Sequence, residues 1–252
     1  PVDGRILPVL LFVIGSSIFG FVINDIADAK LDKKAGKLRN PVASGDLSKG
    51  AAWVLVVVFL GVASLCIYLL NFLNRLLGIV VILLFAGYSF GLRVKARPGL
   101  DVVSHASWNA IYGVMAYSVY RPLDFVGAGL TGMLFLLSIL AELVNQIRDY
   151  DSDRDMIETT VTVVGKKRAF KVCFMLLFLV LALFVCVVLV GGLPWILLVF
   201  SSSIIFLAAP IFNAMRDEKK EQELMPGLLK RGTIIGLLLL VTYLALKIIG
   251  VG

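Results

Sequence analysis

The sequence of 252 residues is poor in the side chains that carry much of soluble enzyme chemistry. It holds one histidine and three cysteines, Cys66, Cys173 and Cys186, and each cysteine lies within an apolar run. Because their spacing fits neither a disulfide framework nor a zinc site, we expect three small, buried thiols. Charged residues make up only 16% of the chain, against about 25% in an average soluble domain. The sequence contains no Ser-His-Asp arrangement and no glycine-rich phosphate loop.

Apolar residues dominate instead, at 60% of the chain with a mean hydropathy of +0.97. They form eight runs that approach the ~20 residues needed to cross a bilayer, so the sequence predicts eight membrane spans in an all-α membrane protein. The predicted spans are Ile6–Ala27, Ala51–Leu70, Leu76–Gly91, Val102–Tyr120, Leu123–Ile147, Ala169–Val190, Leu193–Ala214 and Thr233–Ile249. Polar residues are confined to short loops, which favours one membrane domain over residues 1–252 with two pseudo-repeated halves, roughly 1–120 and 121–252.

The basic residues predict the orientation of these spans. If successive loops alternate between the two sides, 20 of the 24 lysines and arginines fall on one side and four on the other. The richer side is then cytoplasmic, so we expect a multi-pass protein of the cell membrane. Attraction to anionic membrane lipid explains the formal net charge of +7 without a nucleic-acid partner. Nothing in the sequence indicates an obligate protein partner.

Two acidic clusters share the frame Asn-x3-Asp-x3-Asp, each at the cytoplasmic end of a predicted span. The frames are Asn24, Asp28 and Asp32, with Asp25 beside them, and Asn145, Asp149 and Asp153. Steps of four residues return to nearly one face of a helix, so each frame forms a stripe of oxygen atoms. Carboxylates this close repel one another unless a cation lies between them. Mg²⁺ prefers such oxygen ligands and shares them with substrate phosphates, so the frames predict magnesium sites at the membrane edge.

These motifs resemble the signatures of the UbiA superfamily of intramembrane prenyltransferases. Residues 24–32 match the family's first Asp motif, and the segment Arg-Asn-Pro-Val-Ala-Ser-Gly at 39–45 is similar to its Arg-Pro-(Leu/Ile)-(Ala/Pro)-Ser-Gly segment. Residues 145–153 and the segment Thr-Thr-Val-Thr-Val-Val-Gly at 159–165 resemble the second Asp motif and the segment that follows it. The sequence departs from the pattern at Asn40, where many members have proline nearby, at Ser152 and at Thr160.

The resemblance implies Mg²⁺-dependent transfer of a prenyl group from a polyprenyl diphosphate to a lipophilic acceptor within a bundle of helices. The family has nine helices, and because its first motif normally ends the second helix, we expect the first one to be missing from this chain. The resemblance implies two Mg²⁺ ions, with Asp25, Asp28, Asp32, Asp149 and Asp153 as metal ligands and the last four of these as catalytic residues. The implied substrate-binding residues are Asn24, Asn145, Arg39, Tyr88, Ser89, Arg93, Lys95 and Arg148.

Other functions and several acceptors stay open. The run Asn-Gln-Ile-Arg-Asp-Tyr at 145–150 favours a quinone-precursor aromatic such as a naphthoate as the acceptor, with an archaeal-type glycerol lipid second. A cation-coupled membrane transporter would also carry intramembrane carboxylates and internal repeats. Both frames, however, lie at the membrane edge rather than at its midplane, which favours the enzyme. A phosphatidyl transferase of the CDP-alcohol type would show Asp-Gly-x2-Ala-Arg, which this sequence does not contain.

Overall fold

The computed structural model of the chain describes residues 4–36, 39–90 and 92–248. Over these ranges all regular structure is α-helix or short 3-10 helix, which confirms the all-α prediction. Two compact units make up the chain: Pro1–Leu123 with Ser152–Thr159, and Asp124–Asp151 with Thr160–Gly252. The boundary between Leu123 and Asp124 lies close to the division expected near residue 120. That the chain forms one membrane domain stays a prediction.

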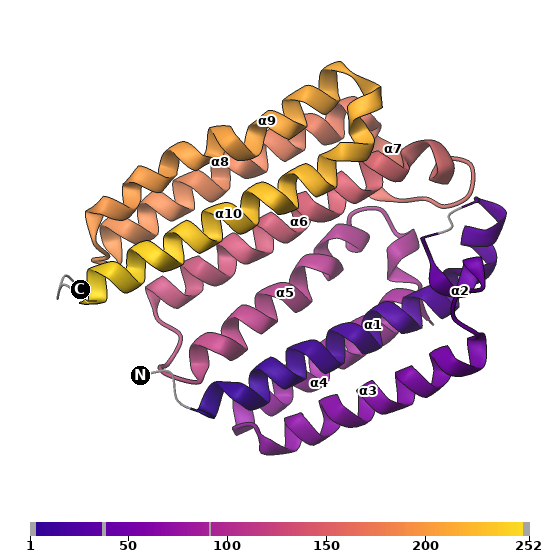
Figure 1. The fold of residues 1–252 in the computed structure, drawn as a ribbon, viewed down its shortest axis with the longest axis horizontal. Helices are drawn as coiled ribbons and strands as arrows, with labels where there is room; N and C mark the ends of the chain where they lie inside the picture. The colour runs from indigo at the N-terminus through magenta and orange to yellow at the C-terminus, as the bar shows by residue number, and fades with distance from the viewer. Residues whose placement is uncertain (1–3, 37–38, 91, 249–252) are drawn as a thin grey trace. The chain divides into compact units, whose positions relative to one another are not determined.

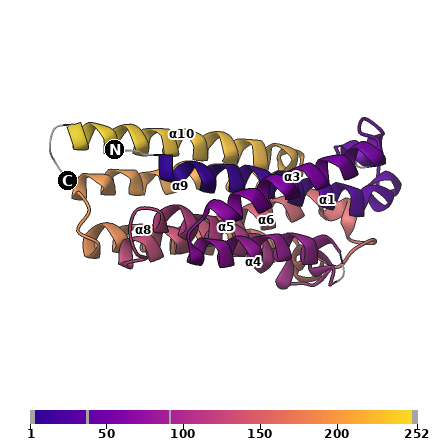
Figure 2. The same ribbon diagram turned by 90° about the horizontal axis from the view of Figure 1, so that it is seen from below.

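Four long helices and three short ones form the first unit. In chain order they are η1 (Gly4–Ile6), α1 (Leu7–Lys34), α2 (Pro41–Ser44), α3 (Lys49–Leu69), α4 (Phe72–Ser89), η2 (Val94–Ala96) and α5 (Leu100–Ser118). Helix α1 packs against α3 and α4, and α4 packs against α5. These helices run lengthwise beside one another (Figures 1 and 2). Helix α1, which carries the first acidic frame, is therefore supported by neighbours along its length.

Local sequence explains where several of these helices begin and end. The Ser48 hydroxyl accepts a hydrogen bond from the Ala51 backbone N–H at 3.2 Å and caps α3. The Asn71 side chain accepts from the Asn74 N–H at 2.9 Å and caps α4 in the same way. Such caps satisfy N–H groups that have no partner in the first turn of a helix. Gly45, with φ 92°, ends α2 in the left-handed conformation that glycine adopts without strain.

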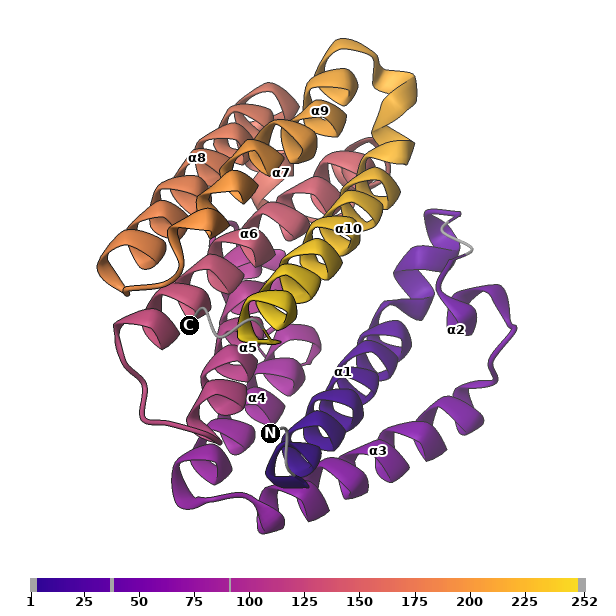
Figure 3. The same cartoon turned by 60° about the vertical axis from the view of Figure 1, so that its left-hand side comes forward.

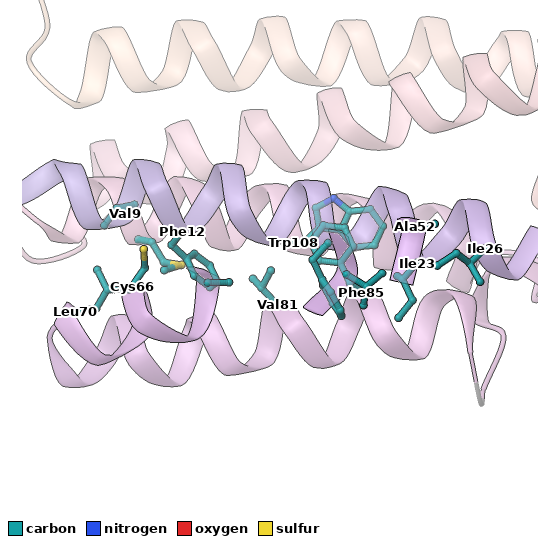
Figure 4. Close-up of a cluster of buried hydrophobic side chains, with 14 residues drawn as sticks. Val9, Phe12, Ile23, Ile26, Ala52, Cys66, Leu70, Val81, Phe85 and Trp108 are labelled. Atoms are coloured by element: carbon teal, nitrogen blue, oxygen red, sulfur yellow. The ribbon is translucent and has the colours of Figure 1, made fainter. Parts of the chain in front are cut away.

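The apolar core of the first unit lies between α1 and its neighbours (Figure 4). Phe85 of α4 stacks on Trp108 of α5, with ring centroids 4.5 Å apart and ring planes 27° apart. Across from them, a Cβ atom at Gly20 of α1 would lie 2.2 Å from Cδ1 of Phe85. Glycine at position 20 therefore lets α1 approach the aromatic pair closely. This contact holds the end of α1 that carries the acidic frame.

The second unit contains the remaining helices. They are α6 (Phe125–Asp153), α7 (Thr160–Val164), α8 (Lys166–Val190), η3 (Trp195–Ser202), α9 (Ser203–Arg216), η4 (Glu218–Lys220) and α10 (Glu221–Ile248). The exception is the last two residues of α6, Ser152 and Asp153, which belong to the first unit. Helix α8 packs against α9, and α9 packs against α10 (Figure 3). Cys173 is buried in α8 and Cys66 in α3, as expected. Cys186 is exposed, so the prediction of three buried thiols was wrong. Its weakly polar thiol suits the apolar outer surface of α8 as well as an interior.

Six helical segments in the part of the chain that the structure describes are long and apolar enough to cross a membrane. They are Gly4–Lys34, Lys49–Leu69, Phe72–Ser89, Phe125–Asp153, Lys166–Val190 and Trp195–Arg216. Their outward faces are apolar; on α3, for example, Val54, Val57 and Leu65 are 61%, 68% and 64% exposed. Such surfaces are typical of helices that face lipid. The chain is therefore an integral membrane protein.

This count differs from the eight spans that the sequence predicted. The two further predicted spans form helices, α5 and α10, of which α5 is not apolar enough over its length to count. Helix α5 carries Asp101, His105 and Asn109. Part of the predicted span Thr233–Ile249 in α10 lies outside the described residues, so the count of six does not test it. Gly91 and Ile249, at which two predicted spans end, lie outside the described residues.

Candidate active site

The first acidic frame lies on one continuous helix. Helix α1 runs to Lys34, past Ala27, where we expected the first span to end. Charged residues end the apolar run there without ending the helix. Asn24, Asp28 and Asp32 therefore follow one another at steps of four on α1, and all three are partly buried.

A buried lysine contacts this frame. Lys95 in η2 is 7% exposed, and its ammonium group forms an ion pair with the Asp28 carboxylate. The same ammonium group donates to Oδ1 of Asn24 at 3.3 Å, and the Ser89 hydroxyl donates to that oxygen at 2.9 Å. A charge this deeply buried is tolerated only when it is paired and hydrogen-bonded. Four residues that the sequence singled out are thus brought together from α1, α4 and η2.

The remaining predicted residues of the first unit lie in different surroundings. Tyr88 places its ring edge-on against Trp108, with centroids 5.3 Å apart at 89°, so it joins the end of the apolar core. Arg93 has φ 45° and ψ 51°, a left-handed conformation that is uncommon outside glycine, and its side chain is exposed. Arg39 is exposed just before α2. Substrate binding by these three residues stays a prediction.

Asn40 belongs to the same group of side chains, although it is not among the site residues predicted from the sequence. It is 4% exposed, and its Nδ2 donates to Oδ2 of Asp32 at 2.8 Å and to the backbone oxygen of Asp25 at 3.0 Å. Asparagine followed by proline is a known signal for the start of a helix, so its role as the cap of α2 could have been anticipated. Its bond to Asp32 could not, because that bond depends on how the chain turns back after α1.

The second frame lies at the end of α6, and Asn145, Asp149 and Asp153 again follow one another at steps of four. The Arg148 guanidinium binds the carboxylate of its neighbour Asp149, with Nε at 3.1 Å and Nη2 at 3.4 Å from the two oxygens. Both side chains are mostly buried, at 18% and 17% exposed. Asn145 and Asp149 belong to the second unit, whereas Asp153 belongs to the first.

Buried Gln146, between the residues of this frame, fixes the short helix α7. Its Oε1 accepts a hydrogen bond from the Val161 backbone N–H at 3.1 Å, and its Nε2 donates to Oε1 of Glu142 at 3.2 Å. The first N–H groups of a helix have no partner within it, so this side chain supplies one to α7. The segment after the second frame is thereby held against α6.

A lysine also pairs with the end of α6. The Lys166 ammonium lies 2.9 Å from Oδ2 of Asp151 and 5.4 Å from the centre of the Tyr150 ring. Asp151 is 73% exposed, in contrast to Asp28, which is 16% exposed. The Lys166 pair is thus open to solvent on its carboxylate side, whereas both partners of the Lys95 pair are largely withdrawn from solvent.

The donor atoms of the two frames suit a hard divalent cation. Within residues 4–36, 39–90 and 92–248, no group of three or more His, Cys, Asp or Glu side chains is gathered closely enough to hold a metal ion. Mg²⁺ does not need such a cage, because it is usually held by one or two carboxylates together with waters and substrate phosphates. The carboxylate oxygens of Asp28 and Asp32 and the amide oxygen of Asn24 are ligands of the required kind.

An apolar cavity of about 500 Å³ lies within the second unit. It is lined by residues of α6, α8, η3, α9 and α10, among them Leu134, Leu137, Leu181 and Phe184. Nearly all of its lining is hydrocarbon; Ser201 and Ser203 supply the hydroxyl groups. A cavity of this size and character suits a flexible hydrocarbon chain.

Comparison with known proteins agrees with these features. A model of the UbiA prenyltransferase family matches residues 2–246. A 4-hydroxybenzoate octaprenyltransferase of Colwellia psychrerythraea is 34% identical over 113 residues, which cover 43% of this chain and 38% of the relative. A digeranylgeranylglyceryl phosphate synthase of Methanothermobacter thermautotrophicus is 25% identical over 167 residues, which cover 66% and 58%. The chain therefore spans less than two thirds of the length of these relatives.

Solved structures share the fold. A UbiA homologue from Archaeoglobus fulgidus, bound to GPP and Mg²⁺, superposes with a TM-score of 0.70 at 19% sequence identity. The match covers 92% of this chain and 85% of the homologue. An arrangement of helices is thus retained where most of the side chains differ.

Proposed function

We propose that this chain, which belongs to the UbiA prenyltransferase family, transfers a prenyl group from a polyprenyl diphosphate to a lipophilic acceptor and releases diphosphate. The group formed by Asn24, Asp28, Ser89 and Lys95 carries the proposal. It presents a carboxylate, an amide oxygen and an ammonium group at one end of the membrane helices. Such a mixture suits a substrate that is an anion and is bound together with a cation.

The reaction breaks the bond between C1 of the prenyl group and the diphosphate oxygen, and the electron pair leaves with the diphosphate. Mg²⁺, when bound, neutralises the negative charge on this leaving group as a Lewis acid. The Lys95 ammonium donates hydrogen bonds to the same developing charge, in a site withdrawn from water where such bonds are strong. The nucleophilic atom of the acceptor forms the new bond to C1 and gives up one proton.

We assign two Mg²⁺ ions to this reaction, one for each acidic frame. Asp28 and Asp32, with Asp25 beside them, would hold the first ion, and Asp149 and Asp153 would hold the second. Asn24 and Asn145 bind through their amide oxygens, and Arg39, Arg93 and Arg148 contribute positive charge for the diphosphate. The Mg²⁺ and GPP bound to the Archaeoglobus homologue support the choice of metal and of donor.

The apolar cavity of the second unit is the proposed site for part of the prenyl chain. Leu137 lies on α6 three turns before Asp149, which at 1.5 Å per residue places it about 18 Å along the same helix. A chain whose diphosphate binds at Asp149 reaches this cavity after a few isoprene units. The apolar lining keeps water away from the part of the prenyl chain that lies in the cavity.

The acceptor is proposed as a quinone-precursor aromatic, with a glycerol phosphate lipid as the second candidate. The two relatives are named for an aromatic acceptor and for a glyceryl phosphate, so both classes occur among similar proteins. The preference for a naphthoate rests on residues 145–150 of the sequence alone. The distribution of basic residues supports a site at the cytoplasmic face of the cell membrane.

A transfer assay tests this function. The protein, reconstituted in lipid nanodiscs, is given labelled geranylgeranyl diphosphate and either a dihydroxynaphthoate, 4-hydroxybenzoate or a geranylgeranyl glyceryl phosphate, with Mg²⁺ or with EDTA. We expect one acceptor class to yield labelled product with Mg²⁺ only. Asp28→Asn should abolish the product, whereas Asp155→Asn, at a carboxylate 83% exposed, should not.

Absence of product with every acceptor, together with absence of Mg²⁺-dependent binding of the diphosphate, would refute the proposed function. Cation movement across sealed vesicles that depends on Asp28, in the absence of any transfer, would favour the transporter instead.

A further inference from the structure

Asn40 occupies the point where the loop after α1 meets the first acidic frame. Its side chain makes four hydrogen bonds: Oδ1 accepts from the backbone N–H groups of Val42 at 2.9 Å and Ala43 at 3.1 Å, and Nδ2 donates to Asp25 and Asp32. A side-chain amide has two N–H donors and two acceptor lone pairs, so its hydrogen-bonding capacity is fully used. This accounts for how the side chain can be 4% exposed.

The partners of Asn40 fix which end of its amide faces the frame. The N–H groups of Val42 and Ala43 can only donate, so they require the amide oxygen. The carboxylate of Asp32 and the carbonyl oxygen of Asp25 can only accept, so they require the amide nitrogen. Rotating the amide by 180° would leave all four bonds unmade. The amide oxygen of Asn40 therefore caps α2, and its amide nitrogen separately binds Asp32.

Asp32 has a physical need for such a partner. It lies in the last turn of α1, where the backbone carbonyl groups lack helical partners and the helix dipole disfavours negative charge. A carboxylate in this position tends to move away from the helix end or to pair with the neighbouring lysines. The bond from Asn40 uses Oδ2 of Asp32 at 2.8 Å and leaves Oδ1 for another partner.

We propose that Asn40 is a positioning residue that orients the Asp32 carboxylate toward the metal-bound diphosphate. The inference rests on the proposed function, because it gives Asp32 the role of a metal ligand. Hydrogen bonds to a ligating carboxylate fix its direction and commonly change metal affinity by about 10–100-fold when they are lost. Asn40 stands at one of the positions where the sequence departs from the family's pattern.

Asn40→Ser separates the two tasks. Serine caps a helix about as well as asparagine, but its side chain is too short to reach Asp32 and cap α2 at once. The matched control is Asn71→Ser, the same replacement at the asparagine that caps α4 through Asn74. Three quantities are measured for each variant: the Mg²⁺ concentration that gives half-maximal transfer, the affinity for Mn²⁺ in the presence of geranylgeranyl diphosphate by electron paramagnetic resonance, and the melting temperature without metal.

We expect Asn40→Ser to raise the half-saturating Mg²⁺ concentration and to weaken Mn²⁺ binding, each by about 10–100-fold, with the KM for the acceptor unchanged. Its melting temperature should stay close to that of Asn71→Ser, which should bind both metals as the wild type does. Wild-type metal affinity in Asn40→Ser would overturn the inference while leaving the proposed function intact, and so would an equal loss in both variants. A wild-type protein that binds no Mn²⁺ with the diphosphate would overturn both.

Discussion

Replacing Lys95 by methionine removes an ammonium group from a nearly closed site and leaves the Asp28 carboxylate without its partner. Methionine has a similar length, so the change removes charge with little loss of packing. Breaking a buried ion pair from one side costs about 3–5 kcal/mol, because the remaining charge stays desolvated. The Asp28 side chain is 16% exposed, so water can still solvate part of the unpaired charge. We therefore expect the lower end of this range, about 3 kcal/mol.

This loss predicts a measurable change in melting temperature. For a chain of 150–250 residues, 1 kcal/mol shifts the melting temperature by about 2–4 °C, so Lys95→Met should melt roughly 6–12 °C below the wild type in detergent without metal. Mg²⁺ alone should raise the melting temperature of the variant more than that of the wild type, because the ion replaces the missing positive charge. Prenyl transfer should fall by about 10²–10³-fold, as expected when one donor to the leaving group is lost.

The matched control is Lys166→Met. Lys166 is itself 17% exposed, but its partner Asp151 is 73% exposed, and ion pairs with a solvated partner contribute about 0–1 kcal/mol. This variant should therefore melt within a few degrees of the wild type and keep its transfer rate. A Lys95→Met protein that melted with the control and transferred at the wild-type rate would show that the buried pair supports neither the fold nor the reaction.

Three further outcomes are expected from the structure. Asp149→Ala should lower the transfer rate at least ~100-fold while the circular dichroism spectrum stays helical, and a retained rate would exclude Asp149 as a metal ligand. Leu181→Trp should fill the apolar cavity and shift donor use toward shorter prenyl diphosphates. The control Leu179→Trp, at an outward position that is 46% exposed, should not change donor use. Equal product lengths from the two variants would place the prenyl chain elsewhere. Gly20→Ala should destabilise the protein by about 1–3 kcal/mol through overpacking against the stacked aromatic ring, while Gly61→Ala, with nothing within 4 Å of its Cβ, should be neutral or slightly stabilising in thermal melts.

The helices could be predicted from the sequence more accurately than their ends or their exposure. Apolar runs locate each long helix, but they end at the first charged residues, whereas α1 continues to Lys34 because the alanine, leucine and lysines that follow Asp28 are good helix formers. Hydropathy also cannot tell which side of a helix is buried. Asp101 of α5 is fully buried and its carboxylate accepts a hydrogen bond from the Val102 N–H at 2.8 Å, a contact that composition does not reveal.

For the candidate site, the sequence predicted what helical geometry determines. A step of four residues is enough to align Asn24, Asp28 and Asp32 on α1. Lys95 was expected near the substrate, but its pairing with Asp28 joins residues 67 positions apart and depends on how α4 and η2 pack against α1. Asn40 was noticed only as a departure from a pattern, because its contact with Asp32 exists only in the folded chain.

The polar character of α5 has a consequence for how the chain enters the membrane. His105 and Asn109 lie in its middle, and a helix with such side chains partitions poorly into lipid by itself. Helix α5 packs on α1 and α4, which are synthesised before it and are apolar enough to insert alone. We therefore expect it to leave the translocation channel against protein already in place. In a ribosome-bound chain that ends after α5, this helix should be retained in the bilayer. When α5 is fused behind an unrelated signal anchor, it should instead be translocated across the membrane.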